Sequence, residues 1–231
     1  MEMDHMMIGM GRPLIFGVMH LEVFLMLASG VFYLICAFFV WKPFRQEKNE
    51  LIGALFAFLL YQAVSMFFMG LEMQTMNMLY SNIASLAVLV GSAYMLKFPF
   101  SRFSEKTRRA AFLLSLIAAL GIFVYFISTP MREMQLMNFT LWYDLVINGI
   151  VVGGSIIAIG IRTAEKWLKV KAIGGGSGVV TCCVVANTAM LGGAMITSSI
   201  FGFLAPVVIL VSLGLARKKQ KEVALNPAPL I

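Results

Sequence analysis

Charged residues are scarce in this chain of 231 residues, since Asp, Glu, Lys and Arg together make up only 13% of it. Hydrophobic residues make up 60%. In a typical soluble domain the share of charged residues is about twice that of this chain. The composition therefore excludes a water-soluble domain and predicts an integral membrane protein.

Histidine and cysteine are also few: the chain has 2 His and 3 Cys. A haem held by two histidines would need both His5 and His20, and His5 lies in the N-terminal tail, so we expect no haem. The motifs of zinc proteases, Ser-His-Asp hydrolases and dinucleotide or P-loop proteins are absent from the sequence. We therefore expect no enzymatic activity and no nucleotide, and we expect the cysteines to be reduced, packed thiols.

Long apolar stretches dominate what is present, and about 20 apolar residues suffice for one helical crossing of a bilayer. Five stretches have that length: 13–41, 51–73, 78–97, 110–129 and 140–161. A sixth, 178–215, is nearly twice too long and has basic residues on both flanks, so we expect two helices that turn at 197–199. The sequence predicts an all-α fold, a polytopic bundle of seven transmembrane helices in one domain over 13–216.

Lys and Arg gather in every second gap between these stretches. The four clusters are Lys42, Arg45 and Lys48; Lys97, Arg102, Lys106, Arg108 and Arg109; Arg162, Lys166, Lys169 and Lys171; and Arg217, Lys218, Lys219 and Lys221. The remaining gaps hold only Arg12 and Arg132. Because cytoplasmic loops collect Lys and Arg, we expect the N-terminus outside and the C-terminus in the cytoplasm. Residues 1–12 then form an outer Met-rich tail and 217–231 a basic cytoplasmic tail.

The net charge of +7 follows from this arrangement. We expect anionic lipid at the cytoplasmic face as its partner, and no nucleic acid. The predicted location is a prokaryotic plasma membrane.

Glycine marks two further segments. In the link 162–177, Lys166–Lys169 is expected to lie on the membrane surface, and Gly174–Ser177 to be a flexible joint. Gly149 and Gly153 have the spacing of close helix contacts, for which we favour packing inside the bundle over a dimer face.

Length and topology are similar to those of microbial rhodopsins, which attach retinal to a lysine of the last helix. The last helix here, 200–215, contains no lysine, so we expect no retinal. Seven-helix proteins of the sugar-efflux type share the topology, but this chain lacks their repeated pattern with Pro-Gln pairs.

Methionine is unevenly distributed: the chain has 18, and the predicted topology places only Met95 clearly on the inner side. One stripe recurs at helical spacing and consists of Met66, Met69, Met73 and Met76. Met19 and Met26 are predicted to flank Glu22 on one face of the first helix. Thioether sulfur is a soft ligand that selects Cu(I) among biological metals.

The N-terminal tail contains Met3, His5, Met6 and Met7, and resembles the Met/His-rich outer tails of copper-uptake proteins. Our leading hypothesis is a membrane protein that binds or conducts a soft cation, Cu(I), from the outer face. Under this hypothesis the N-terminal tail captures the ion and Glu22 balances its charge. The stripe on the second helix and the pair Met19 and Met26 pass the ion inward.

Two alternatives stay open. Met also fills irregular gaps and adapts to partner surfaces, so the Met-rich rim could dock the chain as a cofactor-free accessory subunit of a larger respiratory or oxidase-type complex. A seven-helix sensor ranks last. For Glu22, the alternative to a charge-balancing role is a neutral carboxyl group that is hydrogen-bonded to a neighbouring helix, and the two are given equal weight. Asp144 is expected to be a solvated or capping acid near the membrane interface.

Overall fold

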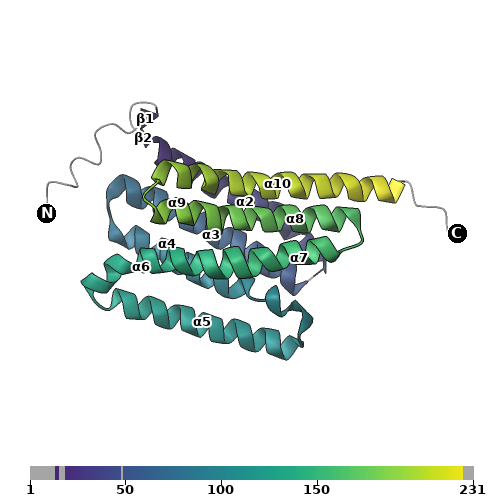
Figure 1. The fold of residues 1–231 in the computed structure, drawn as a ribbon, viewed down its shortest axis with the longest axis horizontal. Coiled ribbons are helices and arrows are strands. Elements are labelled where there is room, and N and C mark those ends of the chain that lie inside the picture. Colours follow the sequence, from purple (N-terminus) through teal and green to yellow (C-terminus); the bar gives the residue numbers. More distant parts are fainter. Residues whose placement is uncertain (1–13, 16–18, 48, 226–231) are drawn as a thin grey trace.

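The computed structural model of the protein describes residues 14–15, 19–47 and 49–225 as a bundle of long helices (Figure 1). A short hairpin comes first, with strands β1 (Leu14–Ile15) and β2 (Met19–His20). The first half continues with α2 (Leu21–Glu47), α3 (Glu50–Thr75), α4 (Met78–Met95), the 3-10 turn η1 (Pro99–Arg102) and α5 (Glu105–Ile127). The second half comprises α6 (Pro130–Asp144), the π-helix η2 (Leu145–Gly153), α7 (Gly154–Arg162), α8 (Lys166–Val180), the π-helix η3 (Thr181–Ala186), α9 (Asn187–Leu191) and α10 (Met195–Leu225).

Seven helical segments of the described chain are long and apolar enough to cross a membrane. They are Leu21–Lys42, Glu50–Thr75, Met78–Met95, Glu105–Ile127, Pro130–Arg162, Lys166–Leu191 and Met195–Lys218. The fifth and sixth each join two α-helices through a π-helix without a break. The predicted helical bundle, with seven helices suited to span a bilayer, is confirmed.

The first helix begins at Leu21 rather than at residue 13. Before it, Leu14 pairs with His20 and Ile15 with Met19 in the hairpin. Since Met19 lies on a strand, helical spacing does not relate it to Glu22 or Met26, and the prediction that all three share one helical face is wrong.

The expected flexible joint at Gly174–Ser177 is also wrong, because these residues lie inside α8, which begins at Lys166. The glycines allow close packing: a Cβ on Gly174 would collide with Ser212, and one on Gly178 with Ile209. The turn before α10 is at 192–194, where Gly193 has φ 78°, and Thr197–Ser199 lie inside α10. A glycine adopts this left-handed conformation without the cost that Thr or Ser would bear.

The loops alternate between two ends of the bundle, as Figure 1 shows. One end, which we call the basic end, comprises 42–47, 49–50, 96–109, 162–171 and 216–225. The other, the methionine-rich end, comprises 14–15, 19–22, 72–80, 127–134 and 190–196. Among the described residues, Arg132 is the one Lys or Arg at the methionine-rich end. The charge pattern seen in the sequence is therefore a difference between the two ends of the folded molecule.

The core is built from every spanning segment except the fourth. Its central cluster includes Tyr33, Phe58, Val152, Cys183 and Ile209. Gly149 and Gly153 are buried against Val184 and Val180, which confirms packing inside the bundle. Helix α5 lies at the edge (Figure 1), and Ala119 is its one buried residue.

Candidate functional site

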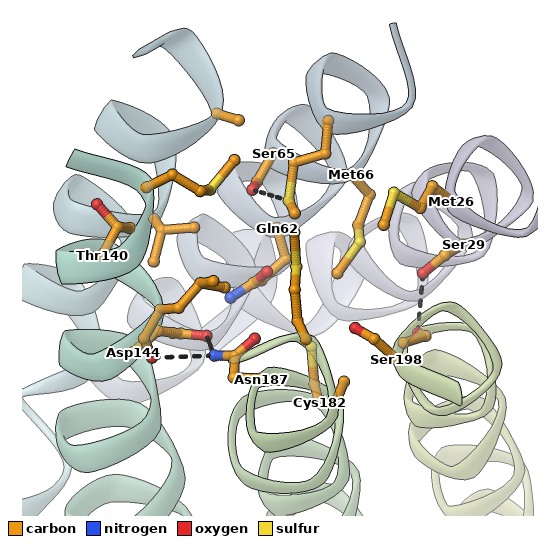
Figure 2. A pocket seen from close by; sticks show the side chains of 18 of the residues that line it. Met26, Ser29, Gln62, Ser65, Met66, Thr140, Asp144, Cys182, Asn187 and Ser198 are labelled. Atoms are coloured by element: carbon orange, nitrogen blue, oxygen red, sulfur yellow. Dashed lines mark hydrogen bonds between the residues drawn. The ribbon is translucent and has the colours of Figure 1, made fainter. Parts of the chain in front are cut away.

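A cavity of about 30 Å³ lies inside the bundle (Figure 2). Its lining residues place it in the half nearer the methionine-rich end. We call it the methionine–aspartate cavity. Every spanning segment except α5 contributes to its lining: Met26, Ser29, Gln62, Ser65, Met66, Met69, Ala84, Ser85, Val88, Met137, Thr140, Leu141, Asp144, Cys182, Ala186, Asn187, Met190, Ser198, Ser199 and Gly202. Its volume suits one or two water molecules or a single ion.

Thioether side chains from four elements meet at this cavity. Met26 of α2 and Met69 of α3 are buried together, and Met137 of α6 and Met190 of α9 pack against them. Met66, one turn before Met69, also lines the cavity, and Figure 2 shows it beside Met26. Helical spacing of three residues aligns Met66 and Met69 on one face of α3. The fold therefore concentrates soft donors that are far apart in the sequence.

The opposite wall carries a buried carboxylate (Figure 2). Asp144, at the end of α6, is only 4% exposed. One of its oxygens accepts a hydrogen bond from Asn148 Nδ2 at 2.6 Å, and the other accepts one from Asn187 Nδ2 at 2.8 Å. Asn148 also donates to Ser92 Oγ at 2.7 Å. The prediction of a solvated or capping acid is wrong, because two amides from within the bundle take the place of water at this carboxylate.

Two π-helices adjoin this polar group. η2 begins directly after Asp144, and η3 ends directly before Asn187. Gly149 of η2 lies against Cys183 and Val184 of η3, so the two segments approach closely. A π-helix shifts the register of the residues around it and is frequent at functional sites. Asp144 and Asn187, which are in contact, each lie next to one of these π-helices.

Hydrogen-bonding capacity remains unused on the polar side. Ser85 Oγ and Thr140 Oγ1 are buried and have no hydrogen-bond partner within the described residues. Both residues line the cavity. Buried hydroxyls in folded proteins nearly always have a partner, so these two groups favour a polar occupant such as water or a hydrated ion.

On the thioether side, one hydroxyl does have a partner. Ser65 Oγ donates to Met69 Sδ at 3.7 Å, one helical turn further along α3. The contact holds the Met69 side chain in place while leaving its second sulfur lone pair available. This is how an outer group orients a ligand.

The structure places the predicted metal ligands in several positions. Met26, Met66 and Met69 line the cavity. Met73 does not line it but packs against the buried cluster that contains Met26 and Met69. Met76 does not continue the stripe, because it ends α3 in a left-handed conformation and is 79% exposed. The helical spacing that defined the stripe stops where α3 ends.

The other candidate ligands lie away from the cavity or cannot be placed. Glu22 is buried at 1% exposure in the first turn of α2 and is not part of the cavity lining. Met19 is half-buried on β2. Met3, His5, Met6 and Met7 lie outside the described residues.

Sequence reasoning missed the carboxylate side of the cavity and two of its methionines. Met137, Thr140, Leu141 and Asp144 follow one another at spacings of three, one and three residues, and Asn187 precedes Met190 by three. These are one-face spacings on a helix, so they were a usable signal. What the sequence could not supply was the contact between α6 and α9 that joins the two faces.

The donor set is unlike that of a zinc or haem site. No group of three or more His, Cys, Asp and Glu residues that could hold a metal occurs in the part of the chain that the structure describes. The donors that converge are five thioethers, the thiol of Cys182, one carboxylate and neutral amides and hydroxyls. Such a set suits a soft monovalent cation better than a divalent ion of borderline softness.

A comparison of the chain with protein-family models, with curated proteins and with solved structures found no match.

Proposed function

We propose that this protein binds Cu(I) at the methionine–aspartate cavity and takes it up from the methionine-rich end. The observation that supports this most directly is the convergence of Met26, Met66 and Met69 on a cavity that also holds the carboxylate of Asp144. Soft thioethers give selectivity, and the carboxylate offsets the charge of the ion.

Charge balance is the reason to assign a role to Asp144. An unpaired cation inside a bilayer-spanning bundle is costly, and a buried counter-charge lowers that cost. A Cu(I) ion with neutral thioether ligands keeps its single positive charge. One carboxylate at the same cavity makes the pair neutral overall, so Asp144 takes the role that the sequence suggested for Glu22.

The direction of uptake follows from the methionines nearest the methionine-rich end. Met73 lies one turn beyond Met69 at the methionine-rich end of α3, and Met190 lines the cavity on the side of that same end. They offer intermediate soft ligands to an arriving ion. If the basic end faces the cytoplasm, the ion arrives from outside.

Metal content per chain tests the proposal. The full-length protein is purified in a mild detergent with Cu(I) and a reductant, and copper per chain is measured by mass spectrometry for the wild type and for the double variant Met66→Leu/Met69→Leu. Exchange of Leu for Met conserves volume in a core, so we expect the fold to persist and the bound copper to fall at least tenfold.

Met95→Leu is the matched control. Met95 is fully buried, but it lies at the end of α4 near the basic end and does not line the cavity. The control should keep the copper of the wild type. Equal copper in the wild type and the double variant, or no copper in either, would contradict the proposal.

A second candidate is an accessory subunit of a larger respiratory or oxidase-type complex. Exposed methionines at the methionine-rich end favour it: Met131 is 83% exposed, and Met76, Met78 and Met195 are exposed as well. Flexible thioether side chains adapt to partner surfaces. A stoichiometric partner that co-purifies with the wild type and is lost when Met76 and Met131 are both replaced by Ser would support this function.

A further inference from the structure

A groove of about 570 Å³ runs between α8 and α10 on the outside of the bundle near the basic end. Its walls are apolar and include Val170, Ile173, Val207 and Val208, with Val211 and Leu215 about half exposed. The one hydroxyl in the lining, that of Ser212, donates to the carbonyl of Ile209. The floor therefore offers no unused polar group and suits a hydrocarbon chain.

A glycine lies where the two walls of the groove meet. Gly174 of α8 faces Ser212 of α10 so closely that a Cβ would collide there. The two helices lie side by side along this contact (Figure 1). Because Gly174 has no side chain, α8 and α10 approach closely at this point, where the two walls of the groove meet.

The mouth of the groove is positively charged. Lys166 and Lys169, one turn apart at the start of α8, line it and are exposed. Neither lysine is in an ion pair with any residue that the structure describes. Arg162, at the end of α7, adds to the positive charge nearby, and Glu165 is the one acid between them.

The length of the groove matches one leaflet. From Lys166 to Gly174, and from Val207 to Leu215, eight residues of helix rise about 12 Å. Half of a bilayer's hydrocarbon core is about 15 Å. A phospholipid with its headgroup at the lysines therefore has room to lay one acyl chain along the groove within a single leaflet.

We infer that this groove is a binding site for an anionic phospholipid, whose phosphate lies at Lys166 and Lys169 and whose acyl chain lies along Val207–Leu215. The charge of the mouth selects the headgroup, and the apolar walls hold the chain. This inference is independent of the copper proposal, because none of its residues lines the methionine–aspartate cavity.

Lipid titration tests it. The full-length protein, delipidated in a neutral detergent, is titrated with phosphatidylglycerol or phosphatidylcholine, and the bound lipid is measured by native mass spectrometry. Each lysine near anionic lipid contributes about 1 kcal/mol, so Lys166→Gln/Lys169→Gln should weaken binding of phosphatidylglycerol about 30-fold. Val211→Trp, which fills the groove, should weaken binding of both lipids.

Lys106→Gln/Arg109→Gln is the matched control, since it removes the same charge from α5 at the same end of the molecule. It should change binding of phosphatidylglycerol less than twofold. Equal affinity for the two lipids in the wild type, an equal loss in the control, or unchanged binding in Val211→Trp would each overturn the inference. The inference would also be overturned if the wild type bound a second copy of the chain, and Val211→Trp lost that copy but kept its lipid.

Discussion

Asp144 is the residue on which the polar half of the cavity depends. Its two oxygens accept from amides that belong to different spanning segments, Asn148 and Asn187. Bonds of this kind to a charged acceptor are stronger than those between neutral groups. Asp144 therefore joins the fifth and sixth segments, in addition to the charge-balancing role proposed for it.

Replacing Asp144 separates these two roles. In Asp144→Leu both amides lose the carboxylate, and each keeps one acceptor, Ser92 Oγ for Asn148 and the Leu141 carbonyl for Asn187. One buried N–H of each amide is then unpaired, which costs about 1–3 kcal/mol. We expect a lower unfolding temperature in detergent and no bound copper. In Asp144→Asn one acceptor oxygen remains, so we expect a smaller loss of stability but a clear loss of copper affinity.

Glu165→Gln serves as the control for the loss of one carboxylate. Glu165 is exposed, and its side chain makes no capping bond at the start of α8. Both stability and copper should stay at the wild-type level. If Asp144→Asn bound copper as tightly as the wild type, the charge-balancing role would be refuted while the structural role could stand.

At the scale of elements, α8 is the helix whose sequence is most misleading. Three consecutive glycines favour flexibility in a soluble chain, since Gly costs about 1 kcal/mol per residue in a helix. Inside a bundle a glycine can stabilise a helix where a neighbouring helix lies close, because the small residue allows the two backbones to approach. Gly174, Gly176 and Gly178 all face such neighbours, whereas Gly175 does not.

The pair Gly178→Ala and Gly175→Ala tests this difference on one helix. A Cβ on Gly178 would collide with Ile209 and lie 3.0 Å from the carbonyl oxygen of Ala205, whereas one on Gly175 would meet nothing within 4 Å. We expect Gly178→Ala to lose about 1–3 kcal/mol of stability. Gly175→Ala should gain up to about 1 kcal/mol from helix propensity. Denaturation in mixed detergent micelles measures both.

The outcome also distinguishes a helix from a joint. If residues 174–177 were a flexible link, neither substitution would meet a close neighbour, and both would change stability by similar small amounts. Opposite signs for the two variants are expected only when α8 is continuous and packed on α10.

At the scale of the whole molecule, the sequence predicted the architecture well and the site in part. Length and hydropathy suffice to count spans because each crossing needs a fixed number of apolar residues. They did not place the turn at Gly193, whose left-handed φ of 78° is a local property of the Gly192–Gly193 pair. They also missed the continuous helix through Gly174, because that helix depends on contact with Ser212 of α10. At the cavity, Met66 and Met69 lie together as their spacing predicted, and Met26 joins them although its predicted partner Met19 lies on a strand. Asp144 was misjudged because its burial involves Asn187, 43 residues away in the sequence.

Orientation in the membrane is a property of the whole molecule, and the uptake direction depends on it. Single cysteines replace Ser128 at the methionine-rich end and Glu165 at the basic end, both exposed. The native Cys36, Cys182 and Cys183 are buried, so they should give little background. A membrane-impermeant maleimide applied to intact bacterial cells should label Ser128→Cys and not Glu165→Cys, because Lys and Arg collect on the cytoplasmic side. After lysis both should react. Labelling of Glu165→Cys in intact cells would place the basic end outside, and the methionines nearest the methionine-rich end would then serve release rather than uptake of the ion.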